Sequence, residues 1–191
     1  QPAGYLDGQD TVGTQGGTGA DDRVDFSIPL GSTTEGTGNR FGELLPASVS
    51  GTVYQDLNND GLQQPGEPGI SGASLQLAGT DDRGSSVSLS RMTDSSGEFR
   101  FDELRPGTYT LSESQPGGFL DGRDALGTQG GTLDNDVAAG FSLVSGQDGT
   151  GNLLGELPPA SLAGFVYEDL DEDAAVDPAE DGVGNVTVTL T

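Results

Sequence analysis

The sequence predicts an all-β protein made of tandem antiparallel β-sandwich repeats of about 113 residues. Three observations lead to this fold class. Long stretches of the chain recur at a nearly constant spacing. Short runs of alternating apolar and polar residues are separated by turns that contain Gly or Pro. No segment has the period of an amphipathic helix.

The internal repeat sets the domain organisation. The run QPAGYLDGQDTVGTQGGT begins at Gln1, and the similar run QPGGFLDGRDALGTQGGT begins at Gln115. Further on, GTGNRFGELLPASVSGTVYQDLNND begins at Gly36 and GTGNLLGELPPASLAGFVYEDLDED at Gly149, so the spacing changes from 114 to 113 residues. We therefore expect the C-terminal part of one repeat in residues 1–46, a complete repeat in 47–159 and the N-terminal part of the next repeat in 160–191.

Short alternating runs predict the strands of the complete repeat. We expect strands at 48–54, 73–77, around 87–89, 98–101, 108–111 and 153–157, with turns at 93–97 and 106–107. The third repeat should form a strand at 186–190, the counterpart of 73–77. Six or seven short strands at this spacing are typical of an antiparallel sandwich. The Gly-rich segment 116–150 carries no clear pattern.

The composition limits both the partners and the means of stabilisation. Acidic residues number 31 against 7 basic ones, all Arg, which gives a formal net charge of -24. Such a chain has no basic patch for nucleic acid or an anionic membrane, and no stretch is apolar enough for membrane insertion. Val, Ile, Leu and Phe lie only slightly above the roughly 20% below which a highly charged chain stays disordered. Because there is no Cys for a disulfide, a bound metal ion is the remaining candidate for extra stabilisation.

One loop has the spacing of a calcium (Ca²⁺) site. Residues 56–67 fit the pattern D-x-[DN]-x-[DN]-G-x5-E at every position. Calcium takes six to eight oxygen ligands at about 2.3–2.6 Å, and alternate residues of a tight loop can direct oxygens to one point. Pro65 and Pro68 disfavour a following helix, so we expect a calcium loop on a β scaffold. The expected ligands are the side chains of Asp56, Asn58, Asp60, Gln64 and Glu67 and the carbonyl of Leu62.

A variant of this loop occurs in the third repeat. Ala174 replaces the turn glycine there, at a cost of about 1 kcal/mol for a residue with a positive φ angle. The additional carboxylates increase the attraction for calcium and also the repulsion without it. For both loops the alternative is an acidic surface turn that binds nothing. The expected ligands are Asp169, Asp171, Asp173, Asp177 and Glu180, with the carbonyl of Ala175.

Other acidic residues recur between the repeats. Asp7 and Asp10 recur 114 residues later as Asp121 and Asp124, and two more acids of the Gly-rich segment, Asp134 and Asp136, follow. These residues could form a second calcium site. In so acidic a chain, solvated loop carboxylates are the favoured interpretation.

Two runs, SVSGTVYQDLNNDGLQQPGEPGISGASLQL and TDSSGEFRFDELRPGTYTLSESQPGGF, resemble the calcium-binding B repeats of serine-aspartate-repeat surface adhesins. The resemblance covers about 48–120 and again 162–191. It implies the immunoglobulin-like sandwich of collagen-adhesin B-type (Cna B) domains and a bacterial cell-surface stalk. It also implies calcium at Asp56, Asn58, Asp60 and Glu67, with further calcium ions in each repeat. Many collagen-adhesin B-type domains carry a Lys–Asn or Lys–Asp isopeptide bond, which this chain cannot form because it has no Lys.

Together these observations predict a structural spacer outside the cell rather than an enzyme. The chain has no His, Cys or Lys, and no nucleophile elbow, phosphate-binding loop or zinc motif. We expect calcium to rigidify each repeat and neighbouring repeats of the same chain to be its partners, while a distal domain contacts a host or matrix ligand. Two alternatives stay open: a module that binds carbohydrate or protein through segment 116–150, and a filament subunit that pairs laterally.

Overall fold

The computed structural model describes residues 1–25 and 35–191, and the chain forms two compact units, residues 1–158 and 159–191. Regular secondary structure in the described residues is β, as predicted, and no helix among them is long and apolar enough to cross a membrane. The strands are β1 (Leu6–Asp7), β2 (Thr18–Ala20), β3 (Arg23–Asp25), β4 (Glu43–Leu44), β5 (Ala47–Gln55), β6 (Ser74–Asp81), β7 (Ser86–Met92), β8 (Glu98–Leu104), β9 (Gly107–Ser114), β10 (Leu120–Asp121), β11 (Thr132–Asp134), β12 (Val137–Leu143) and β13 (Asp148–Leu157).

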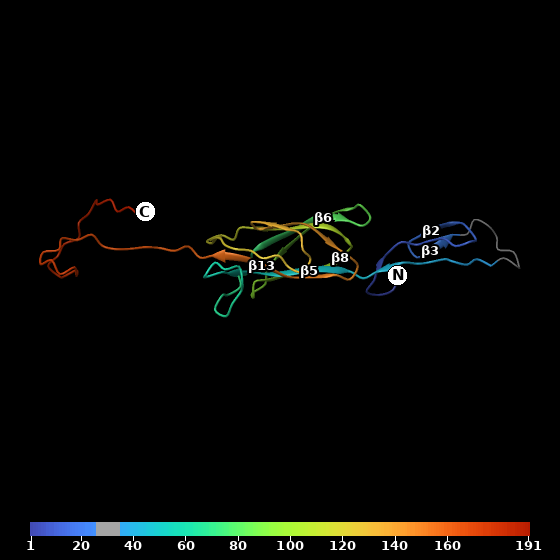
Figure 1. Ribbon diagram of the computed structural model, residues 1–191, viewed down its shortest axis with the longest axis horizontal. Coiled ribbons are helices and arrows are strands. Elements are labelled where there is room, and N and C mark those ends of the chain that lie inside the picture. The colour runs from blue at the N-terminus through green and yellow to red at the C-terminus, as the bar shows by residue number, and fades with distance from the viewer. Residues whose placement is uncertain (26–34) are drawn as a thin grey trace. The chain divides into compact units, whose positions relative to one another are not determined.

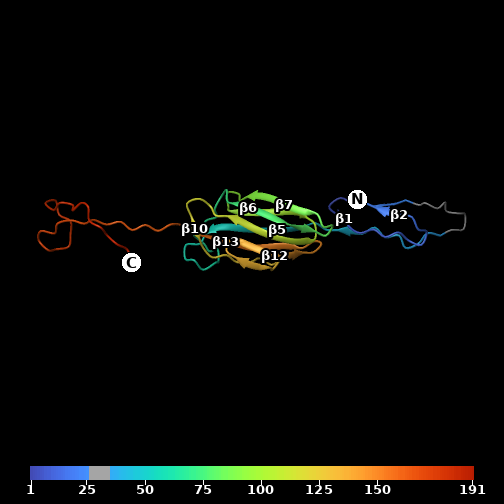
Figure 2. The same cartoon turned by 90° about the horizontal axis from the view of Figure 1, so that it is seen from above.

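Two sheets form a β-sandwich from β5 to β13 (Figures 1 and 2). One sheet has the order β10-β13-β5-β8 and the other the order β11-β12-β9-β6-β7. The predicted antiparallel sandwich is confirmed for every strand pair but one. The exception is the pair of first and last strands, β5 and β13, which run in parallel from Ser48↔Asp148 to Gln55↔Glu156. The chain therefore enters the sandwich at one end and leaves it at the other.

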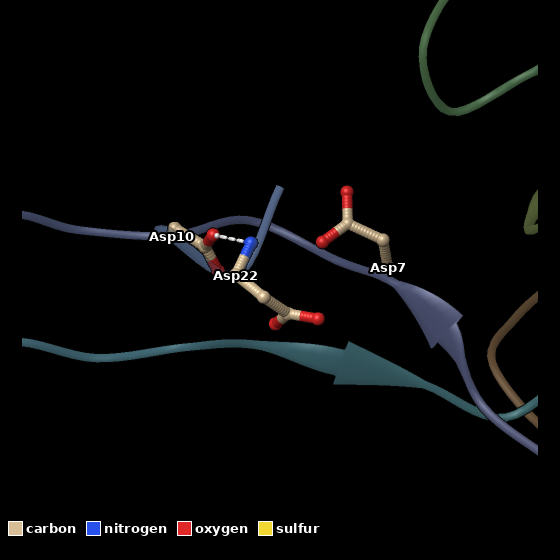
Figure 3. Close-up of side chains that lie close together, drawn as sticks. All are labelled: Asp7, Asp10 and Asp22. Atoms are coloured by element: carbon tan, nitrogen blue, oxygen red, sulfur yellow. Dashed lines mark hydrogen bonds between the residues drawn. The ribbon is translucent and has the colours of Figure 1, made fainter. Parts of the chain in front are cut away.

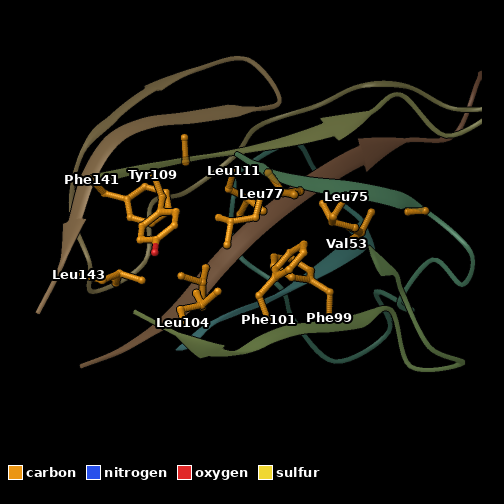
Figure 4. Packing of buried hydrophobic residues seen from close by; sticks show 14 of the residues in the cluster. Val53, Leu75, Leu77, Phe99, Phe101, Leu104, Tyr109, Leu111, Phe141 and Leu143 are labelled. Atoms are coloured by element: carbon orange, nitrogen blue, oxygen red, sulfur yellow. The ribbon is translucent and has the colours of Figure 1, made fainter. Parts of the chain in front are cut away.

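The core lies between the two sheets and is built from alternate residues of the strands, as the period-2 runs predict. The rings of Phe99 and Phe101 are buried and pack edge to face, with their centres 6.2 Å apart. The buried Tyr109 donates its hydroxyl hydrogen to the carbonyl of Arg105 at 2.8 Å, so its one polar atom has a partner. Figure 4 shows these rings among Val53, Leu75, Leu77, Leu104, Leu111, Phe141 and Leu143.

The Gly-rich segment 116–150 supplies three strands that the sequence pattern does not indicate. Two of them, β10 and β11, have only two and three residues, too few for a repeating pattern. The third, β12, contains small residues in place of the usual apolar ones, although it pairs with β9 and brings Phe141 opposite Tyr109. The segment is therefore an integral part of the sandwich.

The described part of residues 1–46 repeats the strand pairing found at the end of the complete repeat. In the first copy β1 pairs with β4 through Leu6↔Leu44 and Asp7↔Glu43. In the second copy β10 pairs with β13 through Leu120↔Leu157 and Asp121↔Glu156. Equivalent residues of the sequence repeat thus make equivalent contacts.

Residues 159–191 contain no strand, only an isolated bridge, so the predicted strand at 186–190 is wrong. Its apolar side chains, Val186, Val188 and Leu190, are exposed. In the complete repeat the equivalent strand, β6, lies between β7 and β9, and residues 160–191 hold no counterparts of these two strands. A single strand does not form because it has no partner for its backbone groups and no surface against which to bury its side chains.

Candidate metal centres

The loop 56–67 follows β5 directly, at the end of the sandwich where β13 also ends. Its first residue, Asp56, is 0% exposed and its last, Glu67, is 8% exposed. The amide of Asp56 donates to the carbonyl of Glu156 at 2.9 Å, and the amide of Gln55 donates to the carbonyl of Pro68 at 2.9 Å. The two ends of the loop are thus joined and attached to the last strand of the repeat.

The carboxylates of Asp56 and Glu67 accept hydrogen bonds from main-chain amides across the loop. The amides of Asp60 and Gly61 donate to Asp56 at 3.2 and 2.8 Å. Glu67 in the same way accepts from two loop amides at 3.0 and 2.8 Å. Gly61 has a φ of 78°, which the pattern requires of its turn glycine. Leu62, whose carbonyl is a predicted ligand, follows this turn and is exposed.

Asn58, Asp60 and Gln64 meet at the mouth of the loop. The Asn58 amide donates to Asp60 and to the Gln64 carbonyl oxygen, both at 3.0 Å, and the Gln64 amide donates to Asp60 at 2.6 Å. The hydrogen bond from Gln64 is the main reason that the pKa of Asp60 lies below its ordinary value. Within the described residues, the carboxylates of Asp56, Asp60 and Glu67 do not converge on one point. We call the five side chains the loop centre: Asp56, Asn58, Asp60, Gln64 and Glu67.

The loop of the third repeat has the same conformation 113 residues later. Glu180 accepts hydrogen bonds from the amides of Leu170 and Asp177 at 2.8 and 2.9 Å, as Glu67 does in the complete repeat. The Ala174 amide donates to Asp169 at 3.2 Å. Ala174 has a φ of 63°, close to that of Gly61. Because this loop forms without a sheet beside it, local hydrogen bonds are sufficient to shape it.

Two groups of three carboxylates lie in this third-repeat loop. Within each group, one oxygen of every residue lies within 4.8 Å of the others. The groups are Asp169, Asp171 and Glu180, and Asp171, Asp173 and Asp177. Ala175 follows the turn, with its amide donating to Asp173 at 2.8 Å. Since all the side chains offer oxygen atoms, both loops fit a hard cation such as calcium.

A second cluster of carboxylates lies between the two sheets at the same end of the sandwich. Glu113 of β9 is 8% exposed and Glu156 of β13 is 0% exposed, and with Asp136 they bring one oxygen each within 4.8 Å of one another. Both oxygens of Glu113, one of Glu156 and one of Asp136 are buried without a hydrogen-bond partner. Since native proteins pair nearly all buried polar groups, these oxygens have the properties of cation ligands.

The pKa values of the cluster also favour its interpretation as a candidate cation site. Burial, with the nearby carboxylates of Glu156 and Asp136, raises the pKa of Glu113 to about 9. Burial raises the pKa of Glu156 to about 7, although a hydrogen bond from Gln115 opposes the shift. The pKa of Asp136 is raised by burial and by the carboxylate of Asp121. These groups resist ionisation, and a divalent cation would compensate for their negative charge.

Asp121 and Asp124 extend the cluster, because one oxygen of each lies within 4.8 Å of the other and of Asp136. Burial raises the pKa of Asp124 to about 6, against the effect of a hydrogen bond from a main-chain amide. Asp121 accepts two hydrogen bonds, at 3.0 and 2.5 Å, from the Asn135 amide when its nitrogen faces the carboxylate. We call the five acids the buried centre: Glu113, Asp121, Asp124, Asp136 and Glu156.

The favoured interpretation of solvated loop carboxylates is therefore wrong for Asp124 and Asp136. Both are half-buried, because the Gly-rich segment folds across the end of the sandwich and places them beside Glu113 and Glu156. Asp134, in contrast, is exposed, and Asp121 lies at the exposed edge of the buried centre.

Sequence reasoning missed Glu113 and Glu156, although a signal was present. Tyr109, Leu111 and Glu113 occupy alternate positions of β9, and Leu154 and Glu156 do so in β13. Because side chains alternate between the faces of a strand, this spacing places both glutamates on the core side. A glutamate at a core position needs a partner, which identifies it as a candidate ligand.

The buried centre recurs in part in the preceding repeat. Asp7, Asp10 and Asp22 stand 114 residues before Asp121, Asp124 and Asp136, and they form a carboxylate group of the same kind (Figure 3). The carboxylate of Asp10 accepts hydrogen bonds from two main-chain amides, of Asp22 and Gly42, at 2.9 and 3.1 Å. The cluster is therefore a feature of the repeat rather than of one copy.

Tyr54 and Gly155 lie between the two centres. The Tyr54 hydroxyl is buried without a partner, and burial together with Asp56 and other carboxylates raises its pKa. A Cβ atom at Gly155 would lie 3.2 Å from the Tyr54 hydroxyl, 3.2 Å from the Asp56 Cβ and 2.4 Å from the Arg123 carbonyl oxygen. No side chain fits between the centres, so Gly155 permits their close approach.

Comparison with known proteins identifies the family. The family model described as "SdrD B-like domain" matches residues 47–147, more than half of the chain. The chain belongs to this family. The SdrD B-like domain covers the sandwich from β5 to the turn before β13. The resemblance to serine-aspartate-repeat B domains is thereby confirmed.

Relatives of the chain include three staphylococcal proteins. Serine-aspartate repeat-containing protein F of Staphylococcus epidermidis is 32% identical over 140 residues, which are 72% of this chain and 8% of that protein. Protein E of Staphylococcus aureus is 32% identical over 147 residues, 72% of this chain and 12% of that protein. Protein C of the same species is 29% identical over 161 residues, 83% of this chain and 17% of that protein. The chain thus spans less than a fifth of the length of these relatives.

Distant likenesses occur among solved structures. The minor pilin GBS52 of Streptococcus agalactiae has a TM-score of 0.39 and 14% identity, over 63% of this chain and 49% of that one. The shaft pilin SpaA of Lactobacillus rhamnosus GG has a TM-score of 0.34 and 16% identity, over 65% of this chain and 52% of that one.

Membership of the SdrD B-like family bears on three of the predictions. The chain is a structural domain and not an enzyme. It works outside the cell, at the bacterial cell surface. Its neighbours are tandem repeats of the same kind, as its own sequence repeat indicates.

Proposed function

We propose that this chain is a segment of the stalk of a bacterial surface adhesin, in which bound calcium ions hold every SdrD B-like repeat rigid. The observation that carries the proposal is the parallel pairing of β5 and β13, with both candidate metal centres at the end where these strands finish. The pairing supports the stalk, and the position of the centres supports the role of calcium.

Parallel pairing of the first and last strands suits a spacer. The chain enters at Ala47 and leaves at Leu157, at opposite ends of two adjacent strands. A strand advances about 3.3 Å per residue, so a repeat extends the chain by roughly 30 Å along β5. Tension on the two ends would pull β5 and β13 past one another and load their hydrogen bonds together. Repeats joined in this way resist extension better than a flexible linker does.

Calcium would fix the end of this strand pair. An ion in the loop centre would hold the loop that leaves β5. An ion in the buried centre would tie Glu156 of β13 to Glu113 of β9 in the opposite sheet. The hydrogen bond from Asp56 to Glu156 joins the two effects. Loading both centres would therefore close the end of the sandwich from which the chain continues to the next repeat.

Calcium is favoured over other cations by the chemistry of the ligands. Both centres offer carboxylate oxygens, the loop centre adds amide oxygens, and the sequence contains no His or Cys that would attract zinc or copper. Magnesium prefers to keep several waters in a strict octahedron, whereas calcium accepts a large set of protein oxygens. Extracellular modules of this kind bind calcium with Kd values of about 10⁻⁴–10⁻³ M, which suits a calcium-rich medium.

The Gly-rich segment favours a structural role over ligand binding. It forms β10, β11 and β12 and supplies Asp121, Asp124 and Asp136 to the buried centre. In this proposal the partners of the chain are neighbouring repeats, and a distal domain contacts the host or matrix.

Calcium titration by calorimetry on the full chain tests the proposal. We expect wild-type protein to bind more than one class of calcium ion and to gain thermal stability. E113Q/E156Q should remove one class of calcium site, and D56N/D60N should remove another. The third-repeat loop should still bind calcium in both variants. D102N removes a surface carboxylate outside both centres and should leave binding unchanged. Absence of binding at millimolar calcium, or binding that neither double variant alters, contradicts the calcium function.

A further inference from the structure

Arg83 connects the complete repeat with the repeat before it. Arg83 lies in the turn between β6 and β7, and its guanidinium donates to the main-chain carbonyl of Asp7 at 3.0 Å and forms an ion pair with the Asp7 carboxylate. Asp7 belongs to β1 of the preceding repeat, where it is paired with Glu43 of β4. Other ion pairs of the described residues, such as that of Arg105 with Asp82, lie within one repeat.

Leu45 makes a second contact across the same joint. Its amide donates to the Ser145 hydroxyl at 2.8 Å, and its carbonyl accepts from the Gly146 amide at 2.9 Å. Gly146 has a φ of 73°, and a Cβ atom there would lie 3.2 Å from the Leu45 side chain. Leu45, which connects the two repeats, therefore contacts the β12–β13 turn of the second repeat.

We propose that Arg83 and the Ser145–Gly146 turn form a docking surface for the preceding repeat of the same chain, which sets the angle between consecutive repeats. A covalent joint alone leaves the two repeats free to bend and to twist. The contact at Leu45 restrains the joint itself, and the contact at Asp7 restrains the adjoining sheet, because β1 is paired with the strand that leads into Leu45. This inference rests on the tandem-repeat part of the proposed function and does not depend on calcium.

The docking surface is preorganised. The Asp81 carboxylate accepts the amides of Arg83 and Ser85 at 3.0 and 2.8 Å, which shapes the β6–β7 turn. Arg105 binds Asp82 with two hydrogen bonds, at 2.6 and 2.9 Å, and attaches the turn to the body of the sandwich. Since these hydrogen bonds already fix the backbone of the turn, contact with the preceding repeat orders few further groups.

Charge complementarity selects the partner. The end of the preceding repeat carries Asp7, Asp10, Asp22 and Glu43, so it strongly attracts a cation. Figure 3 shows one carboxylate oxygen of Asp7 directed toward Asp10 and Asp22 and the other directed away from them. One oxygen of Asp7 pairs with Arg83, and the other is buried without a partner. The chain has 7 Arg residues against 31 acidic residues, so positive charges are scarce. Arg83 places one of them at this joint.

The exposure of the pair determines what its loss should do. The side chain of Arg83 is 46% exposed and that of Asp7 is 20% exposed. An exposed ion pair contributes little to folding and is screened by salt. Removal of Arg83 should therefore change the angle between repeats without unfolding either of them.

Pulsed electron–electron double resonance, which measures the distance between two spin labels, tests this inference on the full chain. Because the sequence has no Cys, Q9C in the preceding repeat and S90C on β7 would be the only labelling sites. We expect one narrow distance distribution for the parent protein. R83Q should broaden it and shift its maximum by several ångströms. R91Q removes the same charge from the same sheet without a contact to the preceding repeat, and it should leave the distribution unchanged. Salt at 1 M should act like R83Q, because the Debye length falls to about 3 Å.

The same distances, measured once in calcium and once in chelator, separate this inference from the calcium function. A distribution that is the same in R83Q and the parent protein overturns the docking surface, whatever the calcium titration gives. If calcium does not bind and R83Q still broadens the distribution, the docking surface stands and the calcium function fails. Light scattering should give a monomer. A dimer that R83Q dissociates would make a second copy the partner and would overturn the assignment to the preceding repeat. The melting temperature of R83Q should match that of the parent protein, because the Arg83 side chain is half exposed and lies outside the core.

Discussion

The main-chain amide of Asp56 donates to the carbonyl oxygen of Glu156 over 2.9 Å. Asp56 begins the loop centre, and the carboxylate of Glu156 belongs to the buried centre, so one hydrogen bond joins the two candidate metal centres. The next peptide strengthens the connection, because the Gly155 amide donates to Asp124 at 3.0 Å. Strand β13 thus contacts both centres, and a substitution at one centre should alter the calcium affinity of the other.

Glu113→Gln should have opposite effects with and without calcium. In chelator at pH 9, the variant removes a charge that burial disfavours and adds an amide group able to donate to the neighbouring carboxylates of Glu156 and Asp136, so we expect the melting temperature to rise. In calcium, the variant removes a ligand, and we expect a loss of about 1–3 kcal/mol in the free energy of unfolding. Glu98→Gln, on the exposed face of β8, is the matched control and should have little effect in either condition. Changes of the same sign in both conditions would count against the buried centre.

Stability in chelator should fall as the pH rises from about 5 to about 9. In the folded protein burial raises the pKa values of Glu113, Glu156 and Asp124 to about 9, about 7 and about 6, above their ordinary values of 4.5, 4.5 and 3.8. Over this range the folded state binds more protons than the unfolded state, so a higher pH favours unfolding. Saturating calcium should remove this loss, because it binds the ionised carboxylates and displaces their protons. Thermal melts at pH 5, 7 and 9 would measure the effect, and equal melting temperatures in chelator at all three would contradict it.

The two loops should respond in opposite ways to exchange of their turn residue. Ala174 and Gly61 both have a positive φ angle, which favours glycine. Ala174→Gly should tighten calcium binding by the third-repeat loop, and Gly61→Ala should weaken it in the complete repeat, each by about 1 kcal/mol or about fivefold. Ala179→Gly changes the same residue type in the same loop without a positive φ and should not improve binding. Calorimetric titration of each variant would check this, and equal affinities for A174G and wild type would refute it.

Gly155→Ala should lower the stability of the complete repeat and the calcium affinity of both centres. The added Cβ would lie 2.4 Å from the Arg123 carbonyl oxygen, so β13 must move where it separates the centres. A Cβ at Gly117 meets no atom within 4 Å, and Gly117→Ala should be close to neutral. Melting temperature and calcium titration of the two variants would show the difference. A Gly155→Ala protein that binds calcium like wild type would mean that the centres are not in contact through β13.

Local patterns predicted much of the fold. Alternation of apolar residues placed Phe99 and Phe101 on the core face, and the spacing of Asp, Asn, Gly and Glu residues singled out loop 56–67 as a candidate calcium site. Both features depend on residues that are close in sequence. The third-repeat loop makes the same point, because its hydrogen bonds form without neighbouring strands.

Features that depend on distant segments were not predicted. The parallel pairing of β5 with β13 joins residues about a hundred positions apart, and nothing in either strand specifies its direction. The buried centre combines Glu113, Asp136 and Glu156 from three segments, so no single motif contains it. The strand expected at 186–190 does not form, although its local pattern of alternating residues is that of a strand. It has no partner strands with which to pair.

The most direct test of the central claim, that calcium fixes the end of β5 to β13, is hydrogen exchange at the Asp56 amide. This amide makes the hydrogen bond to Glu156, so its protection reports whether the two centres stay joined. Exchange would be followed by NMR in chelator and in calcium at a hundred times its Kd. We predict exchange about 100-fold slower in calcium, because ligand binding at that concentration stabilises the folded state by about 2.7 kcal/mol. Equal exchange rates at Asp56 in the two conditions, in a chain that binds calcium, would contradict the claim.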